Sequence, residues 1–266
     1  MVTVSVIGCG NMGSAVVKGL ADTGHSVTAY DVDESALDAV AEYAAETTTD
    51  LGTAAAAPVV VLAVKPGTVT DVLAELDLSP DQTLVSVAAG VETEVIEPRT
   101  DARVVRVMPN LAAEFGEMAA AATPPDLDDD VSAVLDDLGT VVGVEEERMH
   151  LATALNGSGP AFVFYLIAAM GKAGENAGLD PEAAERLAAQ TFKGAAETVL
   201  RADEDVETLI DAVCSPNGTT VEGMAVLRDS DVEAVLDETL RAAERRSEEI
   251  ADEVEHDRDE ADGGNA

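Results

Sequence analysis

The stretch that decides the fold is residues 2–13, VTVSVIGCGNMG. Its first half, Val2–Ile7, is rich in β-branched residues and predicts a buried strand. Its second half predicts a turn that opens a helix, because glycines let the backbone approach a pyrophosphate and a helix N-terminus presents free N–H groups. The turn consists of Gly8, Cys9, Gly10, Asn11, Met12 and Gly13. This pattern predicts a dinucleotide-binding loop; a turn that binds no dinucleotide is the alternative.

An acidic residue follows the second predicted strand, Val27–Tyr30. The Asp31 carboxylate at this position is suited to accept hydrogen bonds from the adenosine ribose. It favours NADH over NADPH, because it repels a 2′-phosphate and residues 30–41 contain no Lys or Arg to offset it. The alternative role for Asp31 is to cap the helix that begins near Glu34.

A second segment supports the same site at the end of a predicted strand over Val59–Val64. Open α/β sheets bind ligands at the carboxyl ends of their strands. We therefore expect contacts with the cofactor from Ala63, Val64, Lys65 and Pro66. Pro66 suits the first turn of the following helix. The Lys65 ammonium either reaches the cofactor ribose or stays in solvent, and both interpretations remain open.

Strands and helices alternate over the first 148 residues, whereas only helices are predicted after them. This order predicts an α/β fold whose N-terminal part is a Rossmann-like, doubly wound parallel sheet. Its further strands are predicted at Thr83–Val87, Arg103–Val107 and Thr140–Val144. Later helices are predicted at Ser158–Ala177, Pro181–Arg201, Val206–Cys214, Thr220–Arg228 and Asp231–Glu253. We expect a dinucleotide-binding domain at residues 1–148 and an all-α domain at residues 149–266.

Charge excludes several classes of partner. The 266 residues carry a formal charge of −38, since 53 acidic side chains oppose 15 basic ones. Nucleic acid and anionic membrane surfaces are not expected as partners, because binding phosphates needs a basic face. The acids are dispersed along the chain, which predicts a surface adapted to a molar-salt cytoplasm, where the Debye length falls to about 3 Å. An ordinary acidic protein is the alternative.

The cysteines and the apolar segments predict a soluble protein of the cytoplasm. Cys9 and Cys214 are too far apart in sequence to form a metal-ligand motif or a disulfide framework. The N-terminus lacks a basic region, so no signal peptide is expected. The uncharged run Leu151–Gly171 is expected to be broken at residues 156–160, which leaves Ala161–Met170, too short to span a bilayer.

Four segments together resemble the pyrroline-5-carboxylate reductase family. They are Ile7–Gly13, Ala63–Pro66, Ala154–Ala161 (ALNGSGPA) and Ser215–Thr220 (SPNGTT). Many dehydrogenases share the first of these segments, whereas the last two are more specific to this family. Similar segments also occur at Ser86–Val91 and Arg106–Asn110, so the resemblance covers nearly the whole chain in order. The departures are Asn156 in place of the usual Ser, Asn217 in place of the usual Gly, and Leu111–Ala112 in place of Thr-Pro.

The resemblance implies a reaction and its residues. Family members reduce Δ1-pyrroline-5-carboxylate to L-proline with hydride from NADPH or NADH, in proline biosynthesis. The matching threonine, Thr220, would hydrogen-bond the imine nitrogen as the catalytic residue. Ser215 and the amides of Gly218 and Thr219 would hold the substrate carboxylate. The resemblance further implies that the helical domain binds substrate and forms homodimers, which associate into rings. Independently of the resemblance, the helix at 161–170 is apolar nearly all round, and such a helix is buried in its own domain or against a partner chain.

The residues of the late segment support anion binding without the resemblance. Thr219 and Glu222 have the spacing of a capping box, with Thr219 as N-cap and Glu222 reaching back. Capping leaves neighbouring N–H groups available to an anion such as a carboxylate. A capped turn between two helices, without a ligand, is the alternative.

Two other functions stay open. Lys172 and Asn176 resemble the Lys-x-x-x-Asn of β-hydroxyacid dehydrogenases, although the preceding glycine run is missing and Glu175 fits a solvated helix face. A non-catalytic, dinucleotide-binding regulator is the second alternative. Reducing a protonated imine needs no general base, unlike oxidising a hydroxyacid. The histidines are accordingly expected at the surface: His25, His150 and His256.

Overall fold

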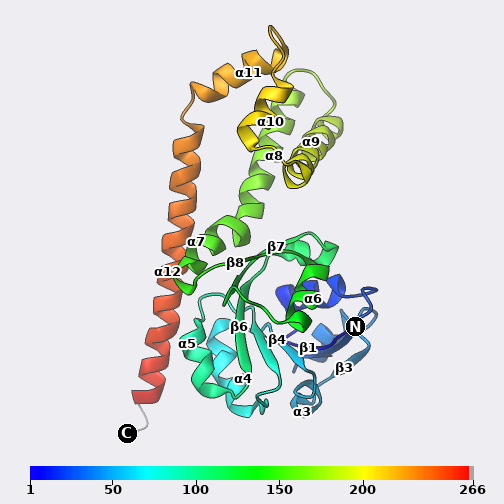
Figure 1. The fold of residues 1–266 in the computed structure, drawn as a ribbon, viewed down its shortest axis with the longest axis vertical. Coiled ribbons are helices and arrows are strands. Elements are labelled where there is room, and N and C mark those ends of the chain that lie inside the picture. The colour runs from blue at the N-terminus through cyan, green and yellow to red at the C-terminus, as the bar shows by residue number, and fades with distance from the viewer. Residues whose placement is uncertain (264–266) are drawn as a thin grey trace. The chain divides into compact units, whose positions relative to one another are not determined.

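A computed structural model describes the backbone of residues 1–263 and the side chains of residues 1–253. The chain forms two compact units (Figure 1). The first comprises Met1–Ser158 and the segment from Leu240 onward, and the second comprises Gly159–Thr239. Helix α12 (Val232–Gly263) therefore contributes to both. The division into a cofactor domain at 1–148 and a substrate domain at 149–266 stays a prediction.

The first unit is built on an eight-stranded sheet with the order β3-β2-β1-β4-β5-β6-β7-β8. Strands β1 to β6 run parallel, β7 is antiparallel to β6, and β8 is parallel to β7. The strands are β1 (Thr3–Ile7), β2 (Ser26–Tyr30), β3 (Glu46–Thr48), β4 (Val59–Leu62), β5 (Thr83–Ser86), β6 (Arg103–Met108), β7 (Met118–Thr123) and β8 (Gly139–Gly143). The Rossmann-like, doubly wound sheet is confirmed, and the antiparallel β7 is an addition to it.

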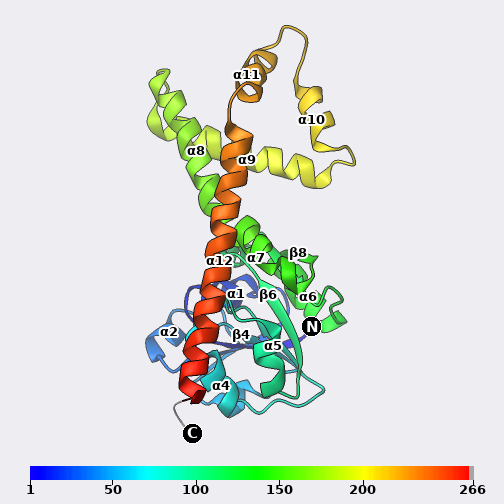
Figure 2. The same cartoon turned by 90° about the vertical axis from the view of Figure 1, so that its left-hand side faces the viewer.

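Helices cover both faces of this sheet (Figure 2). Helices α1 and α6 pack around Val61 and Val105 on one face, and α4 and α5 pack around Leu62 and Leu84 on the other. The helices are α1 (Asn11–Gly19), α2 (Glu34–Asp38), α3 (Leu51–Ala54), α4 (Val69–Glu75), α5 (Thr93–Ile96), α6 (Asp129–Leu138) and α7 (Met149–Ala152). Short turns are η1 (Pro66–Thr68), η2 (Glu97–Arg99), η3 (Leu111–Phe115), η4 (Glu146–Arg148) and the π-helical η5 (Thr153–Gly157).

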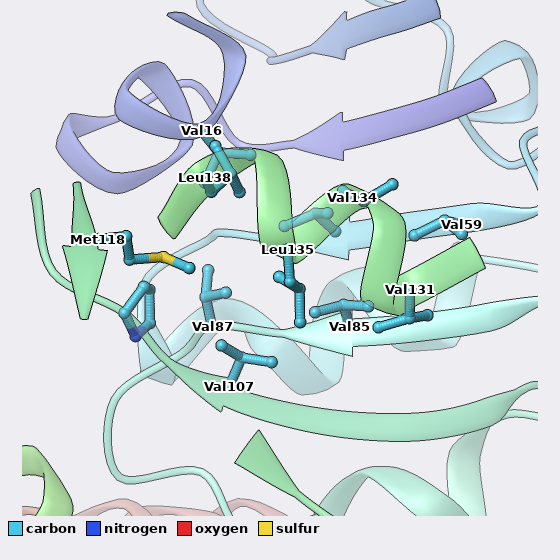
Figure 3. A pocket seen from close by; sticks show the side chains of 12 residues that line it. Val16, Val59, Val85, Val87, Val107, Met118, Val131, Val134, Leu135 and Leu138 are labelled. Carbon is cyan, nitrogen blue, oxygen red and sulfur yellow. The ribbon is translucent and has the colours of Figure 1, made fainter. Parts of the chain in front are cut away.

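A small void lies between α6 and the sheet (Figure 3). Its lining is entirely apolar and includes Val16, Val85, Val107 and Leu135. Ligand sites place a few polar groups that orient the ligand, and none lines this void. The void is therefore a feature of core packing.

The second unit contains α8 (Gly159–Asn176), α9 (Pro181–Arg201), α10 (Val206–Val213), α11 (Thr219–Arg228) and the start of α12. Helices α8 and α9 pack closely through small residues, since a Cβ on Gly171 would lie 3.3 Å from Glu185 Cα. Within this unit, all of which is described, the buried residues are Gly171, Ala184 and Ala188. The helical unit thus has almost no apolar core of its own.

A break in the helix was predicted at residues 156–160. In the structure only Ser158 is non-helical, so the prediction is wrong at the other four positions. Residues 153–157 continue the helix as a π turn, closed by the Ser158 N–H, which donates to the Thr153 carbonyl oxygen at 3.0 Å. As one stretch, Glu146–Asn176 is long and apolar enough to cross a membrane, and 6% of its most apolar window is buried. Length and composition alone therefore do not exclude a membrane span, contrary to the expectation from sequence.

Candidate active site

The glycine loop closes on the neighbouring strand at the point where the strand order reverses, between β1 and β4. Gly8 has φ +95°, and a Cβ there would lie 2.9 Å from the Ala63 carbonyl oxygen. A Cβ on Gly13 would lie 1.8 Å from the Gly8 oxygen, so packing requires both glycines. A Cβ on Gly10 would meet nothing within 4 Å, and Gly10 is the N-cap of α1 without a side-chain cap. The open space beside Gly10 and the uncapped N–H groups fit a pyrophosphate.

The Asp31 carboxylate connects the end of β2 to this loop. Its Oδ2 accepts from the Cys9 N–H at 2.7 Å, and its Oδ1 accepts from the Asp33 N–H at 2.9 Å. The residue that caps α2 is Asp33, whose Oδ1 accepts from the Ser35 N–H at 2.9 Å. The capping alternative for Asp31 is therefore wrong. Each Asp31 oxygen keeps a lone pair that can accept from a ribose hydroxyl.

The segment after β4 lies beside the glycine loop. The Ala63 N–H donates to the Ile7 carbonyl oxygen at 2.8 Å, which holds the two strand ends together. Lys65 is exposed and precedes Pro66, the first residue of η1. Within the described residues Lys65 makes no ion pair, so its ammonium is available to a ligand. The structure thus brings together the predicted cofactor residues of the three segments.

The Cys9 thiol in the glycine loop is buried, with 4% of its surface exposed. Burial, aided by the Asp31 carboxylate, raises the pKa of Cys9 from 9.0 to about 12. Because the thiolate is the reactive form, we expect native Cys214→Ser protein to resist thiol reagents at pH 8 and to react fully in urea. The stabilisation from this shift is present below pH 9 and is lost as the pH rises toward 12. Cys9→Ser, which keeps the partly buried Cys214, is the control; fast modification of native Cys9 at pH 8 would contradict the prediction.

The predicted substrate residues lie in one tight turn of the second unit. The Gly218 N–H donates to the Ser215 carbonyl oxygen at 2.8 Å. Pro216 follows Ser215, and Asn217 has φ +59°, as the third position of a type II turn requires. Gly or Asn suits that position, which explains the departure at Asn217. A Cβ on Gly218 would lie 2.9 Å from the Ser215 oxygen, so this turn needs glycine there.

The predicted capping box is wrong. The N-cap of α11 is Gly218, with extended φ −82° and ψ 163°, and no side chain caps the helix. Thr219 is already the first helical residue, because the turn places the extended residue one position earlier. The consequence for binding is the same, since the first N–H groups of α11 are not satisfied by a side chain and can receive an anion. Ser215, Thr219 and Thr220 are exposed.

Two histidines are not at the surface, contrary to expectation. The His25 side chain is 4% exposed; its Nδ1 accepts from the Val2 N–H at 3.1 Å and its Nε2 lies 3.0 Å from Asp137 Oδ2. The His150 side chain is 15% exposed, with Nδ1 3.0 Å from Ser247 Oγ on α12. Both therefore join distant segments of the first unit. The side chain of His256 lies outside the described residues.

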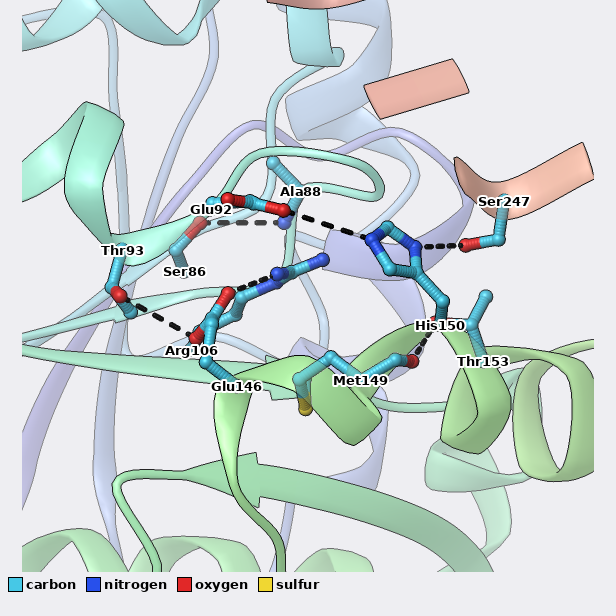
Figure 4. Close-up of polar contacts among 10 residues, drawn as sticks. All are labelled: Ser86, Ala88, Glu92, Thr93, Arg106, Glu146, Met149, His150, Thr153 and Ser247. Carbon is cyan, nitrogen blue, oxygen red and sulfur yellow. Dashed lines mark hydrogen bonds and ion pairs between the residues drawn. The ribbon is translucent and has the colours of Figure 1, made fainter. Parts of the chain in front are cut away.

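An ion pair between a buried arginine and a partly buried glutamate was not foreseen from sequence (Figure 4). Arg106 is 1% exposed, and its Nη1 pairs with Glu146 Oε1. Its Nε and Nη2 find no hydrogen-bond partner among the described residues. Thr93 Oγ1 donates to the other oxygen of Glu146 at 3.4 Å. An arginine inside a valine-rich strand gives no pattern that predicts its burial. Among the described residues, no group of three His, Cys, Asp or Glu is placed to hold a metal ion.

Comparisons with known proteins support the same interpretation. The family model described as pyrroline-5-carboxylate reductase dimerisation matches residues 146–250, and that described as NADP oxidoreductase, coenzyme F420-dependent, matches residues 3–90. The pyrroline-5-carboxylate reductase of Methanosarcina acetivorans is 37% identical over 262 residues, covering 92% of this chain and 97% of the relative. That of Escherichia coli is 32% identical, covering 93% and 98%. The chain belongs to the pyrroline-5-carboxylate reductase family.

Solved structures of this family agree. A pyrroline-5-carboxylate reductase of Coxiella burnetii superposes with a TM-score of 0.85 at 32% identity, covering 94% of this chain and 98% of that one. The Plasmodium falciparum pyrroline carboxylate reductase, solved with NADP bound, gives a TM-score of 0.78 at 25% identity, with the same coverage. As a member of the pyrroline-5-carboxylate reductase family, the chain is an NAD(P)H-dependent oxidoreductase that acts on a cyclic imine.

Proposed function

We propose that this chain reduces Δ1-pyrroline-5-carboxylate to L-proline, the last step of proline biosynthesis, and that its glycine loop and late turn carry the reaction. The single observation that carries the proposal is the open glycine loop beside Gly10, whose Gly8 and Gly13 pack against Ala63 just after β4, in a chain of this family. The test is the rate of NADH and NADPH oxidation with the imine, in about 0.1 M and about 1 M KCl. Proline formation with higher activity in molar salt is the expected result; no oxidation by folded protein would contradict it.

The residues of this chain would share the work as follows. Gly8, Gly10 and Gly13, with Asn11 and Met12, receive the pyrophosphate at the N-terminus of α1. When bound, the nicotinamide supplies the hydride to the imine carbon. The Thr220 hydroxyl would donate a hydrogen bond to the imine nitrogen, and that nitrogen would take a proton from solvent as hydride reaches the carbon, so that C=N becomes a C–N single bond with one new C–H and one new N–H bond. The substrate carboxylate is held by Ser215 and by the N–H groups of Gly218 and Thr219.

We propose a preference for NADH. Asp31, Asp33 and Glu34 place three carboxyl groups after β2, and a 2′-phosphate there meets like charge. Asp31→Asn is expected to raise the NADPH:NADH ratio of kcat/KM about tenfold, which corresponds to 1.4 kcal/mol. Asp38→Asn, an exposed acid on the same segment, is the control and should leave the ratio unchanged. A wild-type preference for NADPH that Asp31→Asn does not alter would contradict the assignment.

The two alternative functions are not favoured. The Lys172 side chain is 62% exposed and its Nζ lies 3.0 Å from both carboxylate oxygens of Glu175. This is the geometry of a solvated helix face, not of a general base in a closed site. The family membership of the chain tells against both a hydroxyacid dehydrogenase and a non-catalytic regulator.

The chain forms oligomers, as its dimerisation region indicates, and we propose that the unit is a homodimer, assembled further into a ring of dimers. The helical unit exposes a large apolar surface: Phe164, Tyr165 and Leu200 are 67%, 74% and 73% exposed. Monomeric soluble proteins rarely leave such surfaces uncovered. We propose that a second copy of the chain, rather than lipid, covers this surface. The apolar run has charged residues at both ends, at 145–148 and at Lys172 and Glu175. We propose that the protein is cytoplasmic and adapted to high salt.

Phe164→Glu is expected to convert the dimer to a monomer. Burying a carboxylate in the contact costs at least about 2 kcal/mol, the loss seen at interface hot spots. The mass from light scattering in molar KCl should fall from that of the assembly to that of one chain, 27.3 kDa. Phe115→Glu, 76% exposed on η3 of the first unit, is the matched control and should leave the mass unchanged. Recovery of the wild-type chain only from membranes would favour a span by α8 instead.

A further inference from the structure

Two asparagines form a reciprocal pair at the end of β6. Asn156 Nδ2 donates to the carbonyl oxygens of Met108 at 2.7 Å and Ala119 at 2.9 Å. In return, Asn110 Nδ2 donates to the Asn156 carbonyl oxygen at 3.1 Å. Asn110 Oδ1 also accepts from the Ala112 N–H at 3.1 Å and caps η3. Each side chain thus satisfies the backbone of the other's segment.

The two carbonyl oxygens that Asn156 bonds, those of Met108 and Ala119, lie where the pairing of β6 with β7 ends. The β6–β7 ladder ends at the pair of Met108 with Ala121, so Ala119 lies beyond the last residue of β6. Because β6 does not continue, its backbone supplies no further donors here, and the Asn156 amide donates to both carbonyl oxygens instead. The residue four positions after Asn156 is Pro160, which has no N–H to donate to the Asn156 carbonyl oxygen, and Asn110 bonds that oxygen instead. A serine has one hydroxyl donor and cannot bond two carbonyls at once.

This pair lies on the edge of the sheet where the cofactor is proposed to bind. Strands β1, β4, β5 and β6 are parallel, so their carboxyl ends share that edge. The glycine loop follows β1, and Asp31 follows β2 on one side of it. With the ribose of adenosine on Asp31, the nicotinamide half extends toward β4, β5 and the end of β6. Asn110 follows β6 directly after Pro109.

From this geometry we propose that Asn156 is a positioning residue for hydride transfer. Its amide holds the end of β6 and the π turn in one arrangement, through Met108, Ala119 and Asn110. It acts through these groups and touches neither cofactor nor substrate. The inference rests on the proposed function, because the edge it shapes is that of the proposed cofactor site.

The test compares Asn156→Ala, Asn156→Asp and Asn156→Ser with wild type. We expect kcat to fall about 10- to 100-fold in the alanine and aspartate variants, since small misplacements of reacting groups cost rates of this order. Asp places a carboxylate against two carbonyl oxygens, whereas Ser keeps one of the two bonds and should be intermediate. The Kd for NADH, from its fluorescence, should remain within about threefold. Glu117→Gln, an exposed side chain just before β7, is the control and should keep the wild-type kcat.

A second readout does not depend on activity. Hydrogen exchange of the peptide over residues 149–160 should be faster in Asn156→Ala than in wild type and Glu117→Gln. Wild-type kcat in a folded Asn156→Ala protein would overturn the positioning role and leave the proposed function intact. Losses of kcat and of NADH binding in proportion to lost stability would do the same. No turnover by wild type would instead overturn the proposed function, and the positioning role with it.

Discussion

Thr220→Ala is expected to lower kcat about 10²- to 10³-fold with little change in NADH affinity. Removing a single well-placed donor to a reacting group has this cost. Thr220 lies in the first turn of α11, beside the turn that is proposed to hold the carboxylate. Alanine is a better helix former than threonine, so α11 should remain intact. Steady-state rates with saturating imine and NADH measure the effect.

Two companion variants make this result specific. Thr220→Ser keeps a hydroxyl and should retain most of the activity. Thr198→Ala removes an exposed threonine hydroxyl that donates to the Gly194 carbonyl oxygen of its own helix at 2.8 Å, and should leave kcat unchanged. A Thr220→Ala enzyme with wild-type turnover would show that another group donates to the imine.

Glu146→Ala is expected to lower the free energy of unfolding by about 3 kcal/mol, the lower end of the range for breaking a buried pair. It leaves the Arg106 charge, 1% exposed, without its carboxylate, while the Arg106 Nε and Nη2 are already without partners among the described residues. Urea unfolding in molar KCl, followed by circular dichroism, measures the loss.

The matched control is an exposed pair that also joins distant segments, Arg228 with Glu207 at 2.7 Å. Glu207→Ala should cost less than about 1 kcal/mol, because both side chains are more than half exposed. Arg106→Met combined with Glu146→Gln should lose less than Glu146→Ala, since it leaves no unpaired buried charge. Equal losses in the free energy of unfolding for Glu146→Ala and Glu207→Ala would contradict the prediction that the burial of Arg106 makes the first loss larger.

Local patterns were sufficient for the parts of the fold whose causes are local. Val2–Ile7 and Val59–Val64 predict strands close to β1 and β4, because β-branched runs of this length favour a buried parallel sheet. The glycine loop was found because the backbone itself demands Gly8 and Gly13. By contrast, β7 consists of Met118, four alanines and Thr123, which carry no strand pattern. Its place between β6 and β8 makes it a strand.

The errors came from contacts that sequence spacing does not encode. The capping box failed because the turn at Asn217 moved the cap to Gly218. His25 and His150 were expected at the surface, yet partners far along the chain bury them. Asn156 was noted only as a departure, and its two strand carbonyls became visible only in the fold.

The sequence by itself determined the doubly wound sheet, the dinucleotide loop, the family and the acidic surface, because each depends on residues adjacent in the chain or on composition. The tertiary structure decided how Asp31 is bound to Cys9, why Arg106 and Glu146 are paired, and how Asn110 and Asn156 complete the end of β6. The physical reason is that burial and hydrogen bonding depend on which distant segments meet, and those meetings are set by the packing of the whole sheet and its helices.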